Sequence, residues 1–182
     1  MIEMKYKSPK RALFVGRFQP FHHGHYYAIK KLLKKFREVV VVIGSSEDSY
    51  SPENPFTCGE RIEMIRACFT NSELARLVIV PVPDINDNRI WVEHVFMHIP
   101  NVDAVYSNNQ LVKMLFSKHG ILVSTIEFFD RGPKEGSNVR RMMADGDRSW
   151  TKHVPPKAVV CLDAFDAEAR LKKIVRMGAR HV

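Results

Sequence analysis

A short loop near the N-terminus carries the residues best suited to chemistry. The stretch GRFQPFHHGH, residues 16–25, follows a short apolar run and precedes a segment with helical spacing. A helix N-terminus presents unpaired amides and partial positive charge, so Arg17, His22 and His25 would face a phosphate bound there. Gly24 omits a side chain that would block the approach. The loop therefore predicts a phosphate-binding site.

Other interpretations of the histidines remain open at this point. Three histidines within four residues also suit a polar helix cap or a metal site. His94 and His98 lie four residues apart on a predicted helix, a spacing that suits a metal ion. Glu93 precedes the first of them, whereas the zincin motif places its glutamate after it, so packing or a subunit contact explains this pair better. The sequence has neither GxGxxG nor GxxxxGK[ST], so a nucleotide would be held in another way.

Strands and helices that alternate along the chain must position the loop. Apolar or β-branched runs predict buried parallel strands, and apolar residues at helical spacing predict the helices between them. The fold class is therefore α/β, a doubly wound parallel sheet of about five strands with helices on both faces. Thr57, followed three residues later by Glu60, predicts a capping box. The predicted strands are 11–15, 38–43, 77–80, 103–106 and 121–126, and the predicted helices are 28–36, 58–69, 110–117, 137–144 and 163–177.

Ligands of such a sheet bind at the carboxyl ends of its strands, where the strand order reverses. The loop 16–25 leaves the first strand and is thus at the expected place. The economical division is a single domain, 1–182, with a catalytic core at 11–145 and a C-terminal helical extension at 146–182.

Composition narrows the classes of protein. The 182 residues are 45% apolar and 26% charged, which suits one globular domain and excludes a disordered chain. There is no apolar run of a length that spans a membrane and no secretory signal, so we expect no membrane partner. The three cysteines form no CxxC pair, which favours a reducing, cytoplasmic location. The net charge of +8, concentrated in residues 1–37, implies an anionic partner: a nucleic acid, a membrane surface or a phosphorylated ligand.

Five motifs together identify a family. The loop contains the HxGH motif, His22-His23-Gly24-His25, of the nucleotidyltransferase superfamily, and its longer string resembles the archaeal type of nicotinamide-nucleotide adenylyltransferase. The resemblance implies a Rossmann-like fold and an enzyme that joins ATP to nicotinamide mononucleotide, giving NAD and pyrophosphate with Mg²⁺. The other motifs, in the same order as in that family, are ENPFTCGERI (53–62), DINDNRIW (84–91), VYSNN around Ser107 and GSNVRRMM (136–143).

The resemblance also assigns roles to residues. It implies that His22, His25, Arg17 and Arg140 are catalytic. The family's second phosphate signature, Gly-Thr-x-x-Arg, reads Gly136-Ser137-Asn138-Val139-Arg140 here, and serine keeps the hydroxyl. It implies no protein ligand to the metal, since Mg²⁺ is carried by the ATP phosphates. The residues that it implies bind ATP are Gly16, Phe18, Gly24, Ser137, Val139 and Arg140.

The acceptor end is implied in the same way. Trp91 would stack on the nicotinamide ring, Asn88 or nearby backbone would read its carboxamide, and Phe56 would belong to a substrate loop. An indole suits a flat, positively charged pyridinium, although Trp91 is also explained as an apolar helix residue. The family resemblance implies a homo-oligomer.

Elementary chemistry agrees with these roles. A phosphate oxygen that attacks the α-phosphorus of ATP needs no protein nucleophile and no general base, only alignment and charge stabilisation. The phosphate residues do not exclude a relative that uses flavin mononucleotide, phosphopantetheine or CTP, whereas the loop 88–91 discriminates. A nucleic-acid-binding module is the remaining alternative. Tyr26 and Tyr27 are the only aromatic residues beside the basic helix face, so we expect no nucleic-acid partner.

Overall fold

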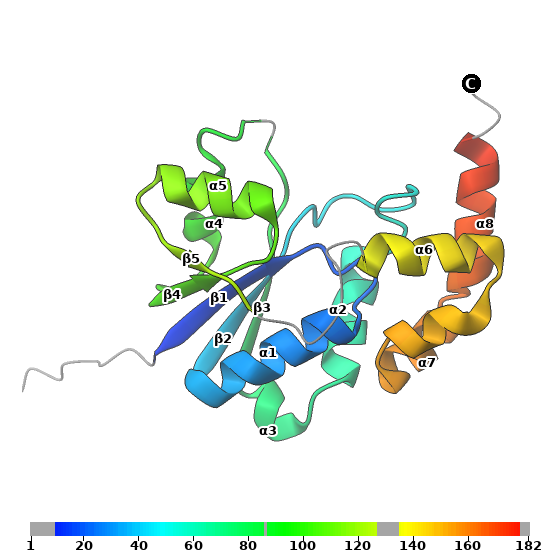
Figure 1. Ribbon diagram of the computed structural model, residues 1–182, viewed down its shortest axis with the longest axis horizontal. Coiled ribbons are helices and arrows are strands. Elements are labelled where there is room, and N and C mark those ends of the chain that lie inside the picture. The colour runs from blue at the N-terminus through cyan, green and yellow to red at the C-terminus, as the bar shows by residue number, and fades with distance from the viewer. Residues whose placement is uncertain (1–9, 86, 127–134, 179–182) are drawn as a thin grey trace, which may run out of the picture.

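The computed structural model describes residues 10–85, 87–126 and 135–178 (Figure 1). The strands are β1 (Arg11–Gly16), β2 (Glu38–Ile43), β3 (Leu77–Pro81), β4 (Ala104–Tyr106) and β5 (Val123–Ser124). The helices are α1 (His23–Lys35), α2 (Cys58–Ala67), α3 (Asn71–Leu74), α4 (Trp91–His98), α5 (Gln110–Lys118), α6 (Glu135–Asp145), α7 (Pro156–Ala164) and α8 (Ala167–Gly178), with a 3-10 helix, η1, at Arg148–His153.

The strands form one parallel sheet in the order β3-β2-β1-β4-β5. The chain runs outward from β1 through β2 to β3, then returns to the other side of β1 with β4. The strand order thus reverses between β1 and β4, which makes their carboxyl ends the expected ligand site. The predicted α/β class and the Rossmann-like, doubly wound arrangement are confirmed.

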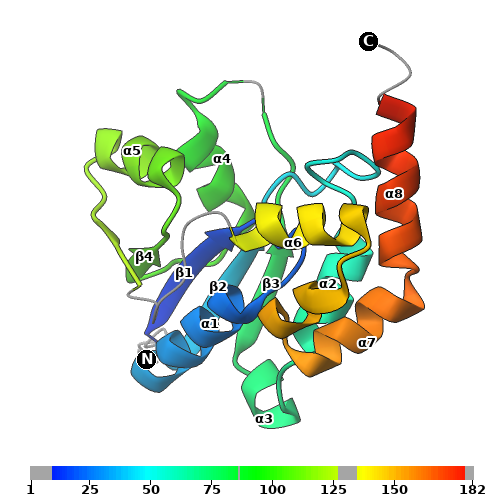
Figure 2. The ribbon, with the colours of Figure 1, turned by 45° about the vertical axis from the view of Figure 1, so that its right-hand side comes forward.

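Each face of the sheet has its own core because side chains alternate along a strand. In β1, Phe14 points into a core that includes α1, α2 and the C-terminal helices, while Leu13 points into a core formed with α4 and α5. β2 divides in the same way, with Val41 on the first face and Val40 on the second. Figure 2 shows α4 and α5 on one side of the sheet and α1 and α2 on the other. Both strands are buried on both faces, as their unbroken apolar sequences predict.

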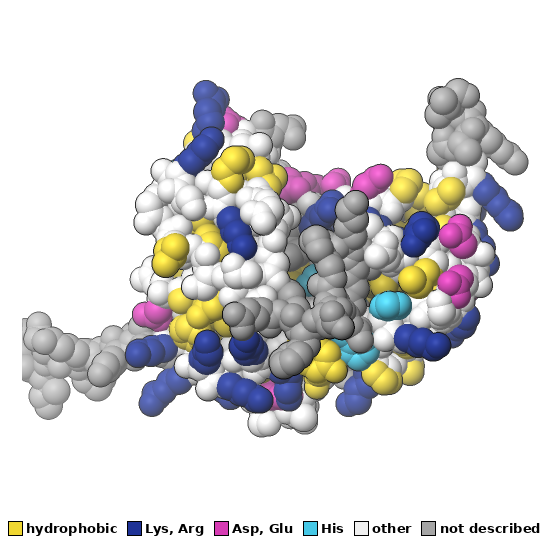
Figure 3. Space-filling model, in the orientation of Figure 1, with side chains coloured by type: hydrophobic (Ala, Val, Ile, Leu, Met, Phe, Trp, Pro, Cys, Tyr) yellow, Lys and Arg dark blue, Asp and Glu magenta, His cyan; other side chains and the backbone are white. Residues whose placement is uncertain are grey.

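Helix α1 is amphipathic, as predicted. Ile29 and Leu32 are buried against the sheet, whereas Lys31 and Lys34 face solvent. Figure 3 shows Lys and Arg side chains gathered over the C-terminal half of this helix. The predicted capping box of α2 is also confirmed, since Thr57 N–H donates to the Glu60 carboxylate and Glu60 N–H donates to Thr57 Oγ1.

Two predicted elements are wrong in extent. The strand predicted at 121–126 is only two residues long because its ends bond elsewhere. Ile121 N–H donates to the Phe116 carbonyl at the end of α5, and Ile126 N–H donates to Asn108 Oδ1. The helix predicted at 163–177 begins too early, because α8 starts at Ala167 and residues 163 and 164 end a separate helix, α7, that was not predicted. The chain turns at Asp166, whose φ of 52° no α-helix can contain.

Across the described residues, none of the helices has the length and apolar character needed to cross a membrane.

Candidate active site

A cavity of about 1050 Å³ opens at the carboxyl ends of β1, β2 and β4. This is the point where the strand order reverses, and its size is at the upper end of the range for small-molecule and cofactor sites. One end is formed by the loop after β1 and the start of α6, and the other by the segment before α4 and the start of α5. The residues that line it are Phe14–Pro20, His22, Gly24, His25, Gly44, Ser45, Asp84, Ile85, Asn88, Trp91, Ser107–Val112, Leu115, Gly136, Ser137 and Arg140.

The loop after β1 is fixed by its buried residues. Phe18 is 1% exposed and has a left-handed backbone, φ 54°, which is unusual for a bulky residue. Its ring lies over Gly16, where a Cβ would be 3.0 Å from Phe18 Cζ, so any other residue would require the Phe18 ring to shift by a few tenths of an ångström. The Gln19 side-chain amide donates to the Phe56 carbonyl at 2.9 Å and accepts from Phe56 N–H at 3.0 Å. These contacts hold the loop's polar groups at the cavity.

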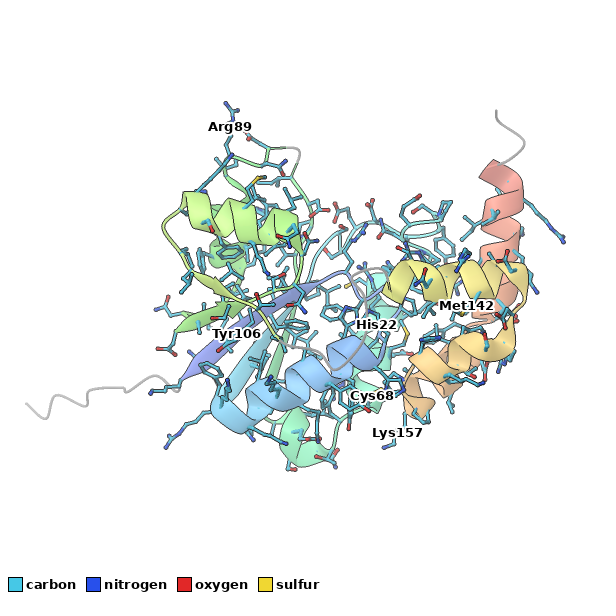
Figure 4. All side chains as sticks on the ribbon, in the orientation of Figure 1. His22, Cys68, Arg89, Tyr106, Met142 and Lys157 are labelled. Carbon is cyan, nitrogen blue, oxygen red and sulfur yellow. The ribbon has the colours of Figure 1, made fainter. Side chains whose placement is uncertain are left out.

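His22 and His25 lie together where the start of α1 meets the start of α6, and Figure 4 labels His22 there. Their rings stack with centroids 3.7 Å apart. His22 N–H donates to His25 Nδ1 at 3.4 Å, so the neutral His25 ring carries its proton on Nε2. Burial, with His22 beside it, holds the pKa of His25 well below its usual range. His25 is therefore uncharged at neutral pH and can donate a hydrogen bond from Nε2. Because Nδ1 serves the helix cap while Nε2 can face a phosphate, the helix-cap and phosphate-site interpretations are compatible.

Arg140 connects three segments at the phosphate end. It donates to the Gln19 carbonyl at 2.7 Å, to the Pro52 carbonyl at 3.0 Å and to Ser137 Oγ at 3.4 Å. Burial and the neighbouring charge of Arg17 lower the pKa of Arg140. Arg17 itself is exposed and lines the cavity. The two guanidinium groups thus gather positive charge where a polyphosphate would lie.

The start of α6 packs closely against the loop after β1. A Cβ on Gly136 would lie 3.4 Å from the Gln19 carbonyl oxygen, which is van der Waals contact, so this turn of α6 lies directly against the loop. Ser137 lines the cavity and is exposed. Val139 does not line it, because its side chain is fully buried in the core below α6.

The acceptor end combines an aromatic ring with carboxylates. Trp91 begins α4, lines the cavity and packs edge-on against Phe116 at 6.0 Å between centroids. Asn88 is exposed at the rim, and Asp84 accepts a hydrogen bond from Ser45 Oγ at 2.5 Å. Asn86, in the same predicted loop, lies outside the described residues. Phe56 is not brought to the cavity but is fully buried in the core.

Arg61 is the residue that sequence reasoning missed. It is fully buried, and its guanidinium group donates hydrogen bonds to backbone carbonyls in the loops after β1 and β2. One nitrogen, Nη1, donates to Arg17 O at 3.2 Å and to Gly44 O at 3.0 Å, which joins the loop after β1 to the loop after β2. The other, Nη2, donates to Ser45 O at 3.0 Å. An arginine in the apolar stripe of α2, beside Met64, is the signal that would have found it.

The residues described around the cavity include one carboxylate, Asp84, and no cluster of metal ligands. Its phosphate end is lined by cations and amides, whereas Mg²⁺ prefers carboxylates and other oxygen ligands. No three or more His, Cys, Asp or Glu side chains gather to hold a metal anywhere in the part of the chain that the structure describes. His94 and His98 bond instead to backbone, with His94 Nε2 2.9 Å from the Pro83 carbonyl and His98 Nδ1 2.8 Å from the His94 carbonyl.

The parallel sheet and the imidazole and guanidinium groups after its first strand define a nucleotidyltransferase. Among solved structures, the fold is similar to a bifunctional NMN adenylyltransferase/ADP ribose pyrophosphatase from Francisella tularensis, complexed with AMP and a Mn ion. The TM-score is 0.73 at 21% identity, over 95% of this chain. The present chain spans 54% of that longer protein.

The chain belongs to the cytidylyltransferase-like family, whose model matches residues 13–157. Within it, the chain is 41% identical to the nicotinamide-nucleotide adenylyltransferase of Methanolobus tindarius over 165 residues, covering 91% of this chain and 94% of that one. It is 40% identical to the enzyme of the same name from Aeropyrum pernix over 170 residues, covering 92% and 99%. The family resemblance drawn from the five motifs is confirmed.

Proposed function

We propose that the protein transfers the adenylyl group of ATP to nicotinamide mononucleotide, giving NAD and pyrophosphate. The observation that carries the proposal is the single cavity with a cationic end and an aromatic end. Its volume suits two nucleotides that react with each other. The names of the relatives, at about 40% identity over nine tenths of the chain, support the same reaction.

The reaction needs alignment rather than covalent catalysis. A phosphate oxygen of the mononucleotide forms a bond to the α-phosphorus of ATP while the bond from that phosphorus to the bridging oxygen breaks. The electron pair leaves with pyrophosphate. Negative charge therefore grows at the phosphate end, where Arg17, Arg140 and the Nε2–H of His25 stabilise it. His22 lines the same end beside His25 and is assigned the same role.

Backbone and small residues complete the ATP site. The first amides of α1 and α6 point at the phosphates, and Ser137 adds a hydroxyl donor. Gly16, Phe18 and Gly24 shape the cavity wall, while Val139, whose side chain is buried in the core, supports α6 from below. A divalent ion, which we take to be Mg²⁺, enters with the ATP phosphates and screens their charge.

The acceptor end selects a positively charged ring. The indole of Trp91 offers a stacking surface, and Asn88 offers an amide that pairs with a carboxamide. The Asp84 carboxylate, positioned by Ser45, adds attraction for a pyridinium cation. We infer that this end disfavours flavin mononucleotide and phosphopantetheine, which carry no such charge. Phe56 supports the site only from the core.

The proposed setting follows from the same observations. The three cysteines, Cys58, Cys68 and Cys161, are free thiols, which suits the cytoplasm. We expect ATP and the mononucleotide to be the partners, with neither nucleic acid nor membrane involved, and we expect a homo-oligomer.

The test is a reaction of purified protein with ATP and Mg²⁺ and one acceptor at a time. The acceptors are nicotinamide mononucleotide, its deamidated form, flavin mononucleotide and phosphopantetheine, and the products are identified by mass. We expect NAD and one equivalent of pyrophosphate with the first acceptor. Pyrophosphate released only with flavin mononucleotide or phosphopantetheine would overturn the assignment. Binding to RNA that weakens steeply with salt, without product, would favour the nucleic-acid alternative.

A further inference from the structure

Three arginines from three different helices hold the segment between β2 and α2, residues 44–57. Arg61 of α2 donates to the carbonyls at its beginning, and Arg140 of α6 donates to Pro52 O in its middle. Arg170 of α8 donates to Pro55 O at 3.4 Å near its end. Figure 2 shows this segment reaching the side of α8. Because Gly44 and Ser45 line the cavity, the segment is one of its walls.

Arg170 makes several contacts, all of them outside the cavity. Its two terminal nitrogens form a fork on the Glu60 carboxylate, at 2.7 and 2.6 Å. Its guanidinium carbon lies 5.1 Å from the centroid of the Tyr50 ring, within the range of a cation–π contact. Arg170 and Glu60 have side chains only 18% and 16% exposed, so water screens this ion pair weakly. Arg170 therefore joins α8 to Tyr50 and Pro55 of the segment and to Glu60 of α2.

Glu60 links Arg170 to the N-terminal cap of α2. Its carboxylate accepts Thr57 N–H at 2.9 Å as well as the Arg170 fork. Burial acts to raise the pKa of Glu60, but the hydrogen bonds from Arg170 and Thr57 outweigh it and leave the pKa lowered. The neighbouring Phe56 is bonded through its backbone to Gln19 in the phosphate loop. A continuous set of contacts thus runs from α8 to the phosphate end of the cavity.

We propose that Arg170 is a positioning residue for ATP, and that helix α8 acts as a brace for the phosphate end of the site. Arg170 touches no cavity residue itself. It holds Tyr50, Pro55 and Glu60 so that the segment 44–57 presents Pro52 O to Arg140 and Phe56 to Gln19. This inference rests on the proposed function only in that ATP occupies the cationic end.

Arg148 of η1 provides a control among the same C-terminal helices. Like Arg170 it makes two charged contacts, to Glu168 of α8 and Asp163 of α7, and it lies over an aromatic ring, Trp150, at 5.0 Å. Its contacts are confined to η1, α7 and α8 and do not reach the segment 44–57. Loss of Arg148 should loosen the C-terminal helices without releasing the segment.

The experiment compares Arg170→Met, Arg170→Lys and Arg148→Met. The dissociation constant of Mg-ATP is measured by calorimetry without acceptor, and steady-state kinetics give KM for each substrate. We expect Arg170→Met to raise the dissociation constant and KM for ATP about fivefold, with KM for the mononucleotide within about twofold of wild type. Arg170→Lys keeps one charge contact and should recover part of the loss. Arg148→Met should bind ATP as wild type does.

Glu60→Gln gives an independent route to the same result. The glutamine oxygen still accepts Thr57 N–H, so the cap remains while the charged fork is lost. We expect weaker ATP binding than wild type, and a loss in the Glu60→Gln/Arg170→Met double variant that is smaller than the sum of the two single losses, because both remove the same ion pair. Should Arg170→Met not fold, Arg170→Lys and Glu60→Gln carry the test.

Several results would contradict the proposal that α8 braces the phosphate end of the site. One is equal weakening of ATP binding by Arg148→Met and Arg170→Met, which would mean that only the general stability of the C-terminal helices matters. Unchanged ATP binding in Arg170→Met and Glu60→Gln is another. These results are separate from the proposed function. If wild type binds ATP but makes no NAD, the reaction assignment fails, while the calorimetric comparison still decides the role of Arg170.

Discussion

The two ends of the cavity are built in different ways. At the phosphate end Arg140 is held by partly buried contacts with distant parts of the chain, such as Gln19 O, 121 residues away. At the acceptor end the polar groups sit on an exposed segment, in which Arg89 pairs with Asp87 two residues earlier and Asp84 is joined to Ser45 and Glu47. Polyphosphate needs charges fixed before it binds, whereas a flat ring needs one surface and a few adaptable groups.

The electrostatics of the two ends also differ in sign. Arg17 and Arg140 make the phosphate end positive, and Asp84 with Glu47, whose carboxylate accepts Asp84 N–H, makes the acceptor end negative. The polyphosphate of ATP is therefore attracted to one end, and the pyridinium of the mononucleotide to the other. This orders the two nucleotides within a single cavity.

Arg61 donates to both the loop after β1 and the loop after β2, so its removal should have the largest effect. Arg61→Met leaves buried carbonyls of the loops after β1 and β2 without a donor, which costs about 3 kcal/mol of stability. Urea unfolding would measure this loss. Because both loops are released, KM should rise for both substrates. If the free energy of unfolding falls but KM rises for only one substrate, Arg61 supports only the end of the cavity that binds that substrate.

His25 tests the phosphate end alone. His25→Ala removes a neutral donor from the developing charge and should lower kcat by more than about tenfold, with the fold intact by circular dichroism. His23→Ala is the matched control, since His23 stacks on Tyr27 and does not line the cavity. Unchanged turnover in His25→Ala would remove that histidine from the mechanism.

Trp91 tests the acceptor end alone. Trp91→Ala should raise KM for nicotinamide mononucleotide about fivefold while KM for ATP stays constant, because in the proposed site the indole meets the pyridinium and not ATP. Trp91→Phe keeps an aromatic face and should recover part of the affinity. An equal rise in both KM values would show that Trp91 acts through the core that it shares with Phe116.

The smallest expected effect is on stability against pH. The pKa of His25 in the folded protein lies below its ordinary value of 6.5, so the unfolded chain binds a proton there that the folded protein refuses. Stability from this group is thus complete above about pH 6.5 and declines as the pH falls toward the folded pKa, by at most about 1.4 kcal/mol per pH unit. Urea unfolding at pH 7 and pH 5.5 should show a smaller decline in His25→Asn than in wild type. Parallel declines in the two proteins would contradict this assignment, and His23→Asn serves as control.

Much of the fold was predictable because its signals are local. The apolar runs of β1 and β2, the amphipathic α1 and the Thr57 capping box are patterns within a few residues. The extent of β5 and the division between α7 and α8 were not predictable. They depend on a hydrogen bond from Ile126 to Asn108 and on the left-handed turn at Asp166, neither of which leaves a periodic trace.

For the site, residue types and order were sufficient to find both ends. His22, His25, Arg17, Ser137, Arg140, Asn88 and Trp91 all line one cavity. The sequence did not distinguish the residues that face the cavity from those that support it. Phe56 and Val139 lie in the same motifs as lining residues, yet their side chains are buried because helix and loop geometry turns them inward.

By itself, then, the amino-acid sequence determined the order of strands and helices, the family and the two sets of groups that would meet the substrates. Only the tertiary structure showed which arginines line the cavity, such as Arg17, and which are held in contacts away from its lining, such as Arg170. Arg61 and Arg170 have the same side chain as Arg17, but their partners are carbonyls and a carboxylate brought close by packing. Residue type and spacing are local properties, whereas the direction of a long side chain depends on contacts made across the whole fold.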